Sequence, residues 1–343
     1  MLPREVPLEP RAKWGDVLRG SARVVGSRTT VGRQYLDLKR GVVSPYETRA
    51  ALGLLYGDPA VEEARYERTR SISGDAQLLA RWLLGRVASR VRGRQPPREE
   101  ARPFVVSTHV AAIDTDQAIK RVVGWLRDGE SRQVFFVHPH ALNIASRDDT
   151  LRANLASGDL VLADGVGVRL AAAILGLRLP ANLNGTDLVP ELLLELSAER
   201  VPVALVGGAP GVAERAAAHW AARTGVRVVG AWNGFATSEE YRAMTDAVAQ
   251  AAPCLVLVGM GSPRQEQFAR HHFQGVAGVV AMTVGGLFDF VGGGKARAPL
   301  PVREMGLEWA WRLALEPRRL GRRYILGNPE FVLRAIKQRL DAR

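Results

Sequence analysis

The chain has 343 residues, 47% of them hydrophobic, and a formal net charge of +12. This length and apolar content suit one large folded domain with an appendage, or two domains. The single cysteine, Cys254, excludes a disulfide within the chain and a zinc site made of several cysteines.

No segment of the sequence has the pattern of a membrane-spanning helix or of a secretion signal. No apolar run approaches the length of about 18 residues that a spanning helix needs, and the first residues lack a signal-peptide apolar stretch. The histidines show no HExxH spacing. We therefore expect a cytoplasmic protein with no structural metal, no cofactor and, at Cys254, a buried inert thiol.

Positive charge is concentrated at the two ends of the chain. Residues 1–103 and 295–343 are basic, whereas residues 104–294 carry a slight acidic excess. Basic segments attract phosphate, whether in a nucleotide, an anionic lipid or a nucleic acid. Charge alone leaves these three partners open.

The first region, residues 1–103, is basic and rich in turns. Its clearest helical pattern begins near Ser73, where Leu78 and Trp82 belong to an apolar series at helical spacing. The charged, proline-bearing stretch from Arg92 to Pro103 predicts a linker and the first domain boundary.

The second region, residues 104–294, alternates strand-like and helix-like segments. Residues 104–113 are expected to form a strand or hairpin edge, and further strands are expected at residues 133–140 and 160–163 and within residues 201–211, 226–235, 254–272 and 278–294. Among the intervening helices, one has Asp114 or Thr115 as its cap and another has Thr237 or Ser238. This alternation predicts an α/β fold with a Rossmann-like, mostly parallel sheet flanked by helices.

The third region, residues 295–343, differs in character from the alternating core. It contains two amphipathic helical pieces and several arginines, with Pro317 at the start of a second turn. We predict a basic helical C-terminal appendage.

Polar or glycine residues follow most of the predicted strands. They are His138, His140 and Asn143; Asp164 and Gly165; Asn184, Thr186 and Asp187; Gly207; and Gly259 with Gln265 and Glu266. The carboxyl ends of parallel strands meet at one edge of a sheet, where glycine turns can leave backbone N–H groups free for phosphate. The sequence therefore predicts a cleft for a phosphate-bearing or nucleotide ligand.

Asp164 is the carboxylate of this set that directly follows a buried strand. It ends the strand LVLA and precedes a glycine turn and an apolar helix, a position where open α/β sheets place their chemistry. A solvent-facing helix cap is the alternative. Spacing alone does not decide between the two.

Two other classes of function are weighed against a transferase. The turn VGGAPG at residues 206–211 approaches a dinucleotide-binding fingerprint, but no acidic residue follows at the expected strand end, so an oxidoreductase is weakly supported. A non-catalytic module that binds nucleic acid or lipid through the basic ends would leave the strand-end residues unexplained.

Five ordered motifs carry a specific resemblance. They are DLVLADGVGV, LNGTDL, VGMGSPRQE, GGLFDFVGG with a following RAP, and GLEWAWRLALEPRRLGRRY. In this order they resemble the WecG/TagA/CpsF family of bacterial glycosyltransferases. The resemblance implies transfer of an N-acetylmannosamine-type sugar, or its uronate, from a UDP donor to a sugar on undecaprenyl diphosphate, in surface polysaccharide biosynthesis.

The resemblance also implies roles for single residues. Asp164, beside Gly165, occupies the position of the family's proposed catalytic base, and direct attack on the donor would make the enzyme inverting. Donor-binding roles fall to Gln265 and Glu266, to Asn184, Thr186 and Asp187, and to the glycine turns at Gly207 and Gly259.

The sequence departs from the family at the strand that enters the site. Many relatives carry Thr-x-Asn there, whereas this chain has His138-Pro139-His140 followed by Asn143. His138, His140 or Asn143 then binds the acceptor or the sugar. His140 is also an alternative base, which leaves the sharing of proton transfer open.

The arginine-rich tail fits the departure of a diphosphate. Five arginines recur within twelve residues of it: Arg312, Arg318, Arg319, Arg322 and Arg323. Of these, Arg312, Arg319 and Arg322 are expected to hold the diphosphate of the leaving UDP, without a metal ion. Apolar tail residues such as Trp309 would face the core or lipid. We therefore expect a peripheral protein at the inner face of the plasma membrane, bound to anionic lipid, with no nucleic-acid partner. The oligomeric state, including a homo-oligomer, stays open.

Residues 1–103 carry a fainter resemblance. Segments such as LKRGVVSPYETR and LLYGDP are similar to the distal end of bacterial sugar transferases that load phospho-sugars onto undecaprenyl phosphate. This implies a docking or acceptor-guiding element, because the membrane segment and the acidic catalytic residues of those enzymes are missing.

Overall fold

The computed structural model describes the chain in several ranges. They are residues 12–19, 21–26, 39, 41–44, 66, 75–76, 78–79, 82, 102–299, 302–303 and 306–342. The chain divides into two compact units, Met1–Arg92 and Gly93–Arg343. Most of the linker predicted at residues 92–103 lies outside the described residues, as do Ser73 and the motif LLYGDP.

The described part of the first unit is small. It contains the helix α1 (Trp14–Leu18) and the parallel pair β1 (Arg23–Val25) and β2 (Gly41–Val43). Small apolar residues, among them Ala22 and Val43, are buried beside this pair.

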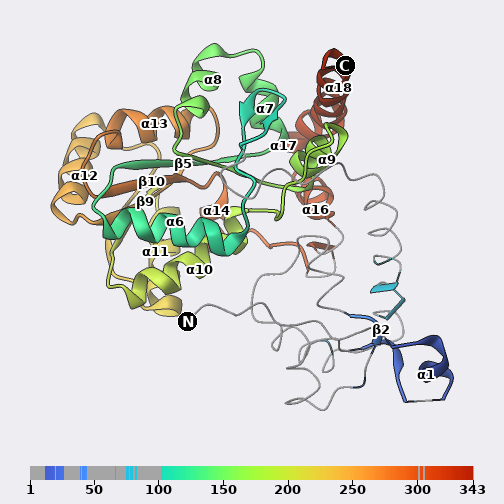
Figure 1. Cartoon of the computed structure of the whole chain (residues 1–343). Helices are drawn as coiled ribbons and strands as arrows, with labels where there is room; N and C mark the ends of the chain where they lie inside the picture. The colour runs from blue at the N-terminus through green and yellow to red at the C-terminus, as the bar shows by residue number, and fades with distance from the viewer. Residues whose placement is uncertain are drawn as a thin grey trace. The chain divides into compact units, whose positions relative to one another are not determined.

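The second unit is built on a six-stranded sheet in which every strand pairing is parallel (Figure 1). In spatial order the strands are β6 (Leu160–Ala163), β5 (Arg132–Val137), β10 (Val279–Thr283), β9 (Cys254–Gly259), β7 (Val203–Gly207) and β8 (Val228–Trp232). The predicted α/β class and mostly parallel sheet are confirmed. The carboxyl ends of all six strands consequently lie along one edge.

Helices cover both faces of the sheet (Figure 1). One face carries α6 (Thr115–Arg127), α10 (Gly185–Ala198), α11 (Val212–Thr224) and α14 (Leu287–Val291). The other carries α7 (Pro139–Ala145), α8 (Asp149–Ala156), α9 (Val166–Ile174), α12 (Ser238–Gln250) and α13 (Arg264–Phe273). Alternate strand residues supply the two cores, since neighbouring side chains of a strand point to opposite faces; Phe136 joins the first and Phe135 the second.

Short-range signals set the helix starts. Asp114 caps α6 and Thr237 caps α12, each in a capping box with the Gln or Glu three residues later. The caps predicted at these two helices are confirmed. A small antiparallel hairpin, β3 (Phe104–Val105) with β4 (Thr108–His109), precedes α6.

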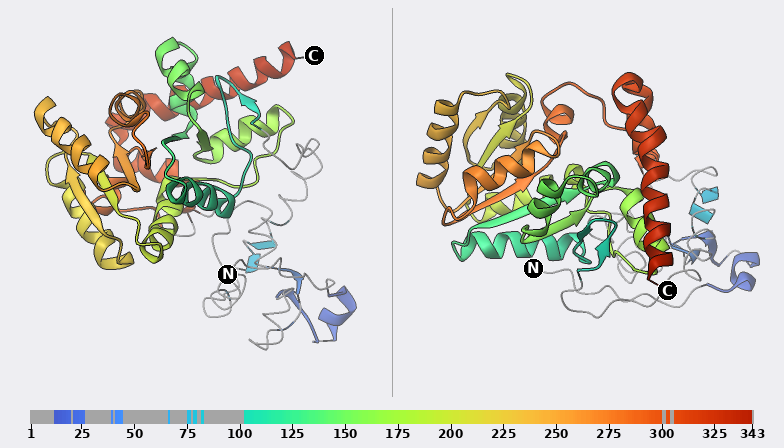
Figure 2. Two further views of the ribbon diagram at one scale, coloured as in Figure 1. Left: turned by 60° about the vertical axis from the view of Figure 1, so that its left-hand side comes forward. Right: turned by 90° about the horizontal axis from the view of Figure 1, so that it is seen from above.

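The C-terminal tail contains four helical pieces. They are α16 (Glu308–Leu315), α17 (Pro317–Gly321), the π-helical turn η1 (Arg322–Leu326) and α18 (Gly327–Asp341). The helix α18, red in Figure 2, packs against α7 and α9. Its side chains Phe331 and Ala335 are buried. Arg339 donates from Nη1 to the carbonyl oxygen of Leu175 at 3.0 Å. The last helix is therefore part of the core.

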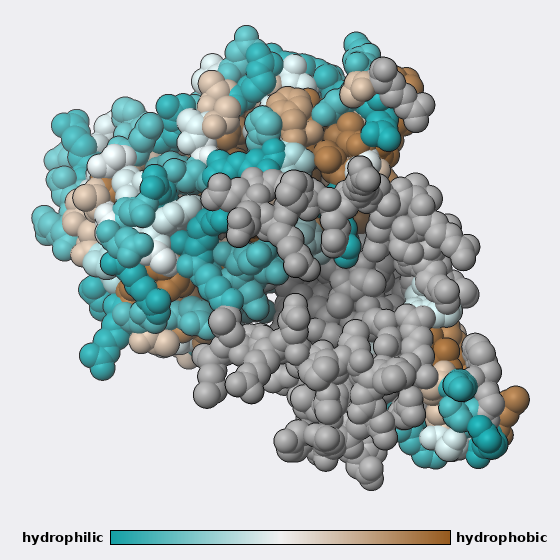
Figure 3. Space-filling view, viewed as in Figure 1, coloured by the Kyte–Doolittle hydropathy of each residue, from teal (hydrophilic) through white to brown (hydrophobic). Residues whose placement is uncertain are grey.

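Apolar side chains are also exposed over α9 and α18, where Figure 3 shows brown surface. They are Val166 and Leu170 on α9, and Leu333, Ile336 and Leu340 on α18. Within the described ranges, no helix is both long enough and apolar enough to cross a bilayer.

Gly207→Ala is expected to destabilise the fold. The φ of Gly207 is +141°, and an added Cβ would lie 2.2 Å from the carbonyl oxygen of Gly259. Strain and clash together should lower the free energy of unfolding, measured by urea denaturation, by about 3 kcal/mol or more.

Gly124→Ala, inside α6, is the matched control for this glycine substitution. Nothing lies within 4 Å of the Cβ it would add, and its φ is ordinary. It should raise the free energy of unfolding by about 0.5–1 kcal/mol. Equal effects of the two substitutions would contradict the tight packing assigned to Gly207.

Candidate active site

A cavity of about 1020 Å³ opens at the carboxyl edge of the sheet. It is lined by segments that follow β5, β7, β9 and β10 and by residues of the tail. Of the residues predicted for the site, those that line it are His140, Asn143, Gly259, Arg312, Arg319 and Arg322. The cavity is as large as typical small-molecule sites, which measure about 300–1,000 Å³.

Glycine turns form one wall of the cavity, and they pack closely on one another. The backbone N–H of Gly208 donates to the carbonyl oxygen of Gly259 at 3.0 Å. A Cβ on Gly259 would lie 2.8 Å from the ring of Phe288. Gly207 does not line the cavity itself, but its conformation brings Gly208 into the wall.

Gln265 and Glu266, predicted to contact the donor, are buried behind this wall. The Oε1 atom of Gln265 accepts from the backbone N–H groups of Gly261 at 3.2 Å and Gly285 at 2.9 Å. Oε1 of Glu266 accepts from Ser262 Oγ at 2.7 Å. Two of the backbone N–H groups expected to be free for phosphate are therefore already bonded to a side chain.

Asp164 follows β6, and its backbone N–H donates to the carbonyl oxygen of Val137 at 2.8 Å. The N-cap residue of α9 is Gly165, with no side-chain capping bond and with φ of +93°. The backbone N–H of Gly165 donates to Asn182 Oδ1 at 2.7 Å. The alternative that Asp164 is a plain, solvent-facing helix cap is therefore wrong.

The surroundings of Asp164 raise its pKa above that of an ordinary carboxyl group. Burial, followed by the negative charge of Glu308, raises its pKa to about 6, and Arg312 and Arg323 oppose this rise. A carboxylate with a pKa near neutrality suits general-base chemistry, because it is ionised at the working pH and still accepts a proton.

The two histidines lie together at the start of α7, with ring centroids 6.1 Å apart. His138 Nδ1 accepts from the backbone N–H of Ala141 at 3.0 Å, which leaves the proton of the neutral ring on Nε2. Burial, then the charge of Arg323, lowers the pKa of both histidines, that of His138 furthest. His140 is the histidine that lines the cavity.

Asn143 joins the cavity wall to the tail. Its side chain is 5% exposed, and Nδ2 donates to the carbonyl oxygen of Gly327 at 2.7 Å. This bond fixes the first residue of α18 against α7. Oδ1 of Asn143 is buried and makes no hydrogen bond within the described part of the chain.

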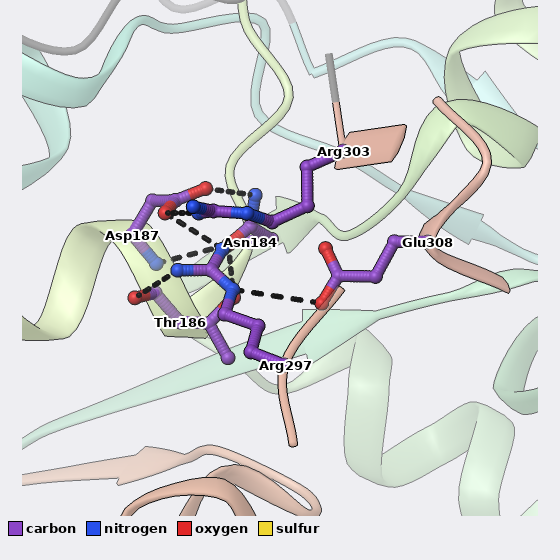
Figure 4. Close-up of polar contacts among 6 residues, drawn as sticks. All are labelled: Asn184, Thr186, Asp187, Arg297, Arg303 and Glu308. Atoms are coloured by element: carbon purple, nitrogen blue, oxygen red, sulfur yellow. Dashed lines mark hydrogen bonds and ion pairs between the residues drawn. The ribbon is translucent and has the colours of Figure 1, made fainter. Parts of the chain in front are cut away.

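Asn184, Thr186 and Asp187, predicted as a donor-sugar pocket, do not line the cavity. Asn184 caps α10 and accepts through Oδ1 from the hydroxyl of Thr186 at 2.7 Å. One oxygen of Asp187 accepts from Asn184 Nδ2 at 2.8 Å, and the other from Arg297 Nη2 at 2.7 Å (Figure 4). The polar atoms of this cluster are therefore largely hydrogen-bonded to one another and to Arg297.

Of the five tail arginines named from the sequence, four line the cavity and Arg318 does not. Arg323 lines the cavity beside Arg312, Arg319 and Arg322 and is half-buried. Burial is also the main cause that lowers its pKa. The sequence could not single it out from the pair Arg322-Arg323, since adjacent helical residues point in different directions. The π-helical turn places both in the wall.

A second feature of the wall had no signal in the sequence. Phe235, in the loop after β8, is 71% exposed and lines the cavity. The guanidinium carbon of Arg264 lies 5.3 Å from the centre of its ring, and Arg264 also donates to the carbonyl oxygen of Gly234. An isolated aromatic residue in a turn is too common a pattern to predict such a platform.

The fold and the cavity together define a Rossmann-like α/β protein with a cationic small-molecule site at the carboxyl edge of its sheet. The sequence model of the Glycosyl transferase WecG/TagA/CpsF family matches residues 104–343. The chain belongs to this family, which confirms the resemblance drawn from the five motifs.

Family membership indicates a glycosyltransferase of cell-surface polysaccharide synthesis and implies, in general, a nucleotide-sugar donor and a lipid-linked acceptor. This favours the transferase over the oxidoreductase and the non-catalytic module. The match begins at residue 104, so residues 1–103 lie outside it. In the described ranges, no group of three or more His, Cys, Asp or Glu side chains is arranged to hold a metal ion.

Gln265→Leu is expected to loosen the glycine wall. It leaves the backbone N–H groups of exposed Gly261 and half-buried Gly285 without their acceptor, and the loss of a hydrogen bond typically costs about 0.5–1.5 kcal/mol. The free energy of unfolding in urea should fall by about that amount. Gln267→Leu, at an exposed position of the same helix, should change it by less than about 0.5 kcal/mol. Equal free energies of unfolding for the two variants would refute the role of Gln265 in bracing the glycine turns.

Proposed function

We propose that the protein is an inverting, metal-independent transferase. It moves an N-acetylhexosamine-type sugar from UDP to a sugar on undecaprenyl diphosphate. The first candidate for the transferred sugar is N-acetylmannosamine or its uronate. One observation carries the proposal: Arg312 and Arg323 line the cavity and also act on Asp164, which is not itself a lining residue and whose pKa is raised to about 6. A base and a cationic diphosphate site are the two groups that this reaction requires.

The reaction follows from these two groups. Asp164 removes the proton of the acceptor hydroxyl as that oxygen attacks the anomeric carbon from the face opposite UDP. The bond from the anomeric carbon to the phosphate oxygen breaks, and UDP leaves with the electron pair. The guanidinium groups of Arg312, Arg319, Arg322 and Arg323 stabilise the charge that develops on the diphosphate. His140, neutral and in the cavity wall, is the second candidate for the proton.

The donor nucleotide has a place in the same cavity. Base stacking on an aromatic side chain contributes about 1–3 kcal/mol, and exposed Phe235 backed by Arg264 offers such a surface. The uracil would lie there, with the diphosphate against the glycine turns and the tail arginines. Gln265 and Glu266 then support the donor site from behind, because their side chains are buried.

The acceptor side faces lipid in this proposal. The exposed apolar residues of α9 and α18, together with the exposed Lys337 of α18, suit an anionic membrane surface at the inner face of the plasma membrane. Residues 1–103 would guide the lipid-linked acceptor, and no nucleic acid takes part.

The direct test offers a panel of UDP-sugars together with a short-chain lipid-diphosphate-sugar acceptor, with and without EDTA. Transfer from a UDP-N-acetylhexosamine at equal rates in both conditions is expected. Loss of transfer with EDTA would refute metal independence. Tight NADH binding without any affinity for UDP would instead select the oxidoreductase.

Asp164→Asn should lower kcat by about 10²–10⁴-fold, the usual contribution of a general base, while UDP still binds. In the wild type, kcat/KM should fall as the pH drops below about 6, because protonation of Asp164 removes the base. Transfer assays over a pH series measure both effects. Near-normal turnover of Asp164→Asn would assign the proton transfer to another group, with His140→Ala as the next variant.

Arg323→Gln should lower kcat by about 10²-fold or more, as expected when one group that stabilises transition-state charge is removed. Arg318→Gln is the matched control, because Arg318 is exposed and does not line the cavity. Steady-state kinetics with a saturating donor compare the two. A similar loss of kcat in both variants would mean that the total positive charge of the tail matters, and not a specific contact of Arg323.

A further inference from the structure

Arg297 joins two distant parts of the chain beside the site (Figure 4). Its Nη2 atom lies 2.7 Å from Asp187 Oδ1 at the start of α10, and its Nε atom lies 3.6 Å from Glu308 Oε1. Glu308 is the first residue of α16. The three side chains are only 19–27% exposed, so water screens these ion pairs less than it screens an ordinary surface pair.

The Asp187 end of this chain of contacts is itself fixed. Asn184 Nδ2 donates to Asp187 Oδ2, and Arg297 Nη1 donates to the carbonyl oxygen of Thr186 at 3.4 Å. Arg303 Nη1 lies 3.7 Å from the same oxygen of Asp187 that Arg297 binds. The motif LNGTDL therefore presents a rigid carboxylate to the tail.

α16 depends on such contacts for its position. None of its residues is fully buried; Trp311 and Leu313 are half-buried, so apolar packing holds this helix less firmly than the buried Phe331 holds α18. A second cation holds its other end: Lys295 Nζ lies 2.9 Å from Asp289 and 3.1 Å from Glu316, the residue that follows α16. Ion pairs therefore hold the helix at both ends.

α16 carries two charges to the site. Arg312 lies four residues after Glu308, hence on the same side of the helix, and it lines the cavity. The charges of Glu308 and Arg312 both act on Asp164, one raising and the other lowering its pKa. A small displacement of α16 would move both groups away from the carboxylate.

We propose that Asp187, Arg297 and Glu308 form an anchor that positions α16, so that Glu308 and Arg312 face Asp164. The anchor residues are positioning residues, and LNGTDL serves the tail in place of a donor-sugar pocket. The catalytic part of this inference rests on the proposed transferase function. The anchoring part depends only on the contacts of Arg297.

Hydrogen–deuterium exchange of the full chain tests the anchoring without any substrate. Arg297→Met should speed amide exchange in Glu308–Leu315, and Arg297→Lys should do so partly, because an ammonium cannot span both carboxylates as a guanidinium does. Arg127→Met is the matched control, since Arg127 is 59% exposed and pairs with Glu199 at a surface. Unchanged exchange in Arg297→Met would overturn the anchor.

Kinetics test the positioning. Arg297→Met should lower kcat by about 10²-fold, the usual cost of a reacting group misplaced by about 1 Å, whereas Arg127→Met keeps wild-type kcat. Glu308→Gln should move the acid limb of kcat/KM to lower pH, because it removes a negative charge that raises the pKa of Asp164. The other charged groups that act on Asp164 are Arg312 of α16, Arg323 of η1 and Asp187 of α10.

The outcomes separate the two proposals. A looser α16 in Arg297→Met with wild-type kcat would overturn the positioning role in an active enzyme. A wild-type chain that uses no UDP-sugar would refute the transferase function. In that case the exchange experiment still decides whether Arg297 anchors α16.

Discussion

Removing the carboxylate of Asp164 from water costs free energy, and guanidinium groups from far along the chain offset part of that cost. Arg312 and Arg323 lower the pKa of Asp164, whereas burial and Glu308 raise it, and the balance lies at about 6. The sheet fixes the position of Asp164, since its backbone N–H donates a hydrogen bond to Val137 at the end of β5. The tail has to bring the guanidinium groups of Arg312 and Arg323 that act on this carboxylate.

The tail reaches the site because three kinds of interaction hold it. Apolar burial of Phe331 and Ala335 fixes α18, a single amide of Asn143 fixes its first residue, and ion pairs of Arg297 and Lys295 attach α16. Their response to salt differs, because dissolved ions screen ion pairs and do not screen apolar contacts. The parts of the tail nearest the reacting groups therefore depend in part on contacts that salt weakens.

The sequence was most informative where one residue type has one structural consequence. Apolar runs ending in glycine predicted the strands and their common edge, and Asp114 and Thr237 predicted helix starts. It was least informative for side-chain direction. Gln265 points into the protein and braces two turns, and Asp187 binds an arginine 110 residues away. No local pattern encodes such a partner, because it depends on how the tail returns to the sheet.

The capping bond of His138 has a consequence for ligand chemistry. A histidine normally titrates near neutral pH and can present either nitrogen as donor or acceptor. Here Nδ1 is occupied by a backbone amide, and burial beside Arg323 disfavours the imidazolium form. The lowered pKa favours the neutral ring, whose remaining proton is on Nε2 and points in a fixed direction. The group that meets this nitrogen must carry a lone pair, as a carbonyl, hydroxyl or carboxylate oxygen does.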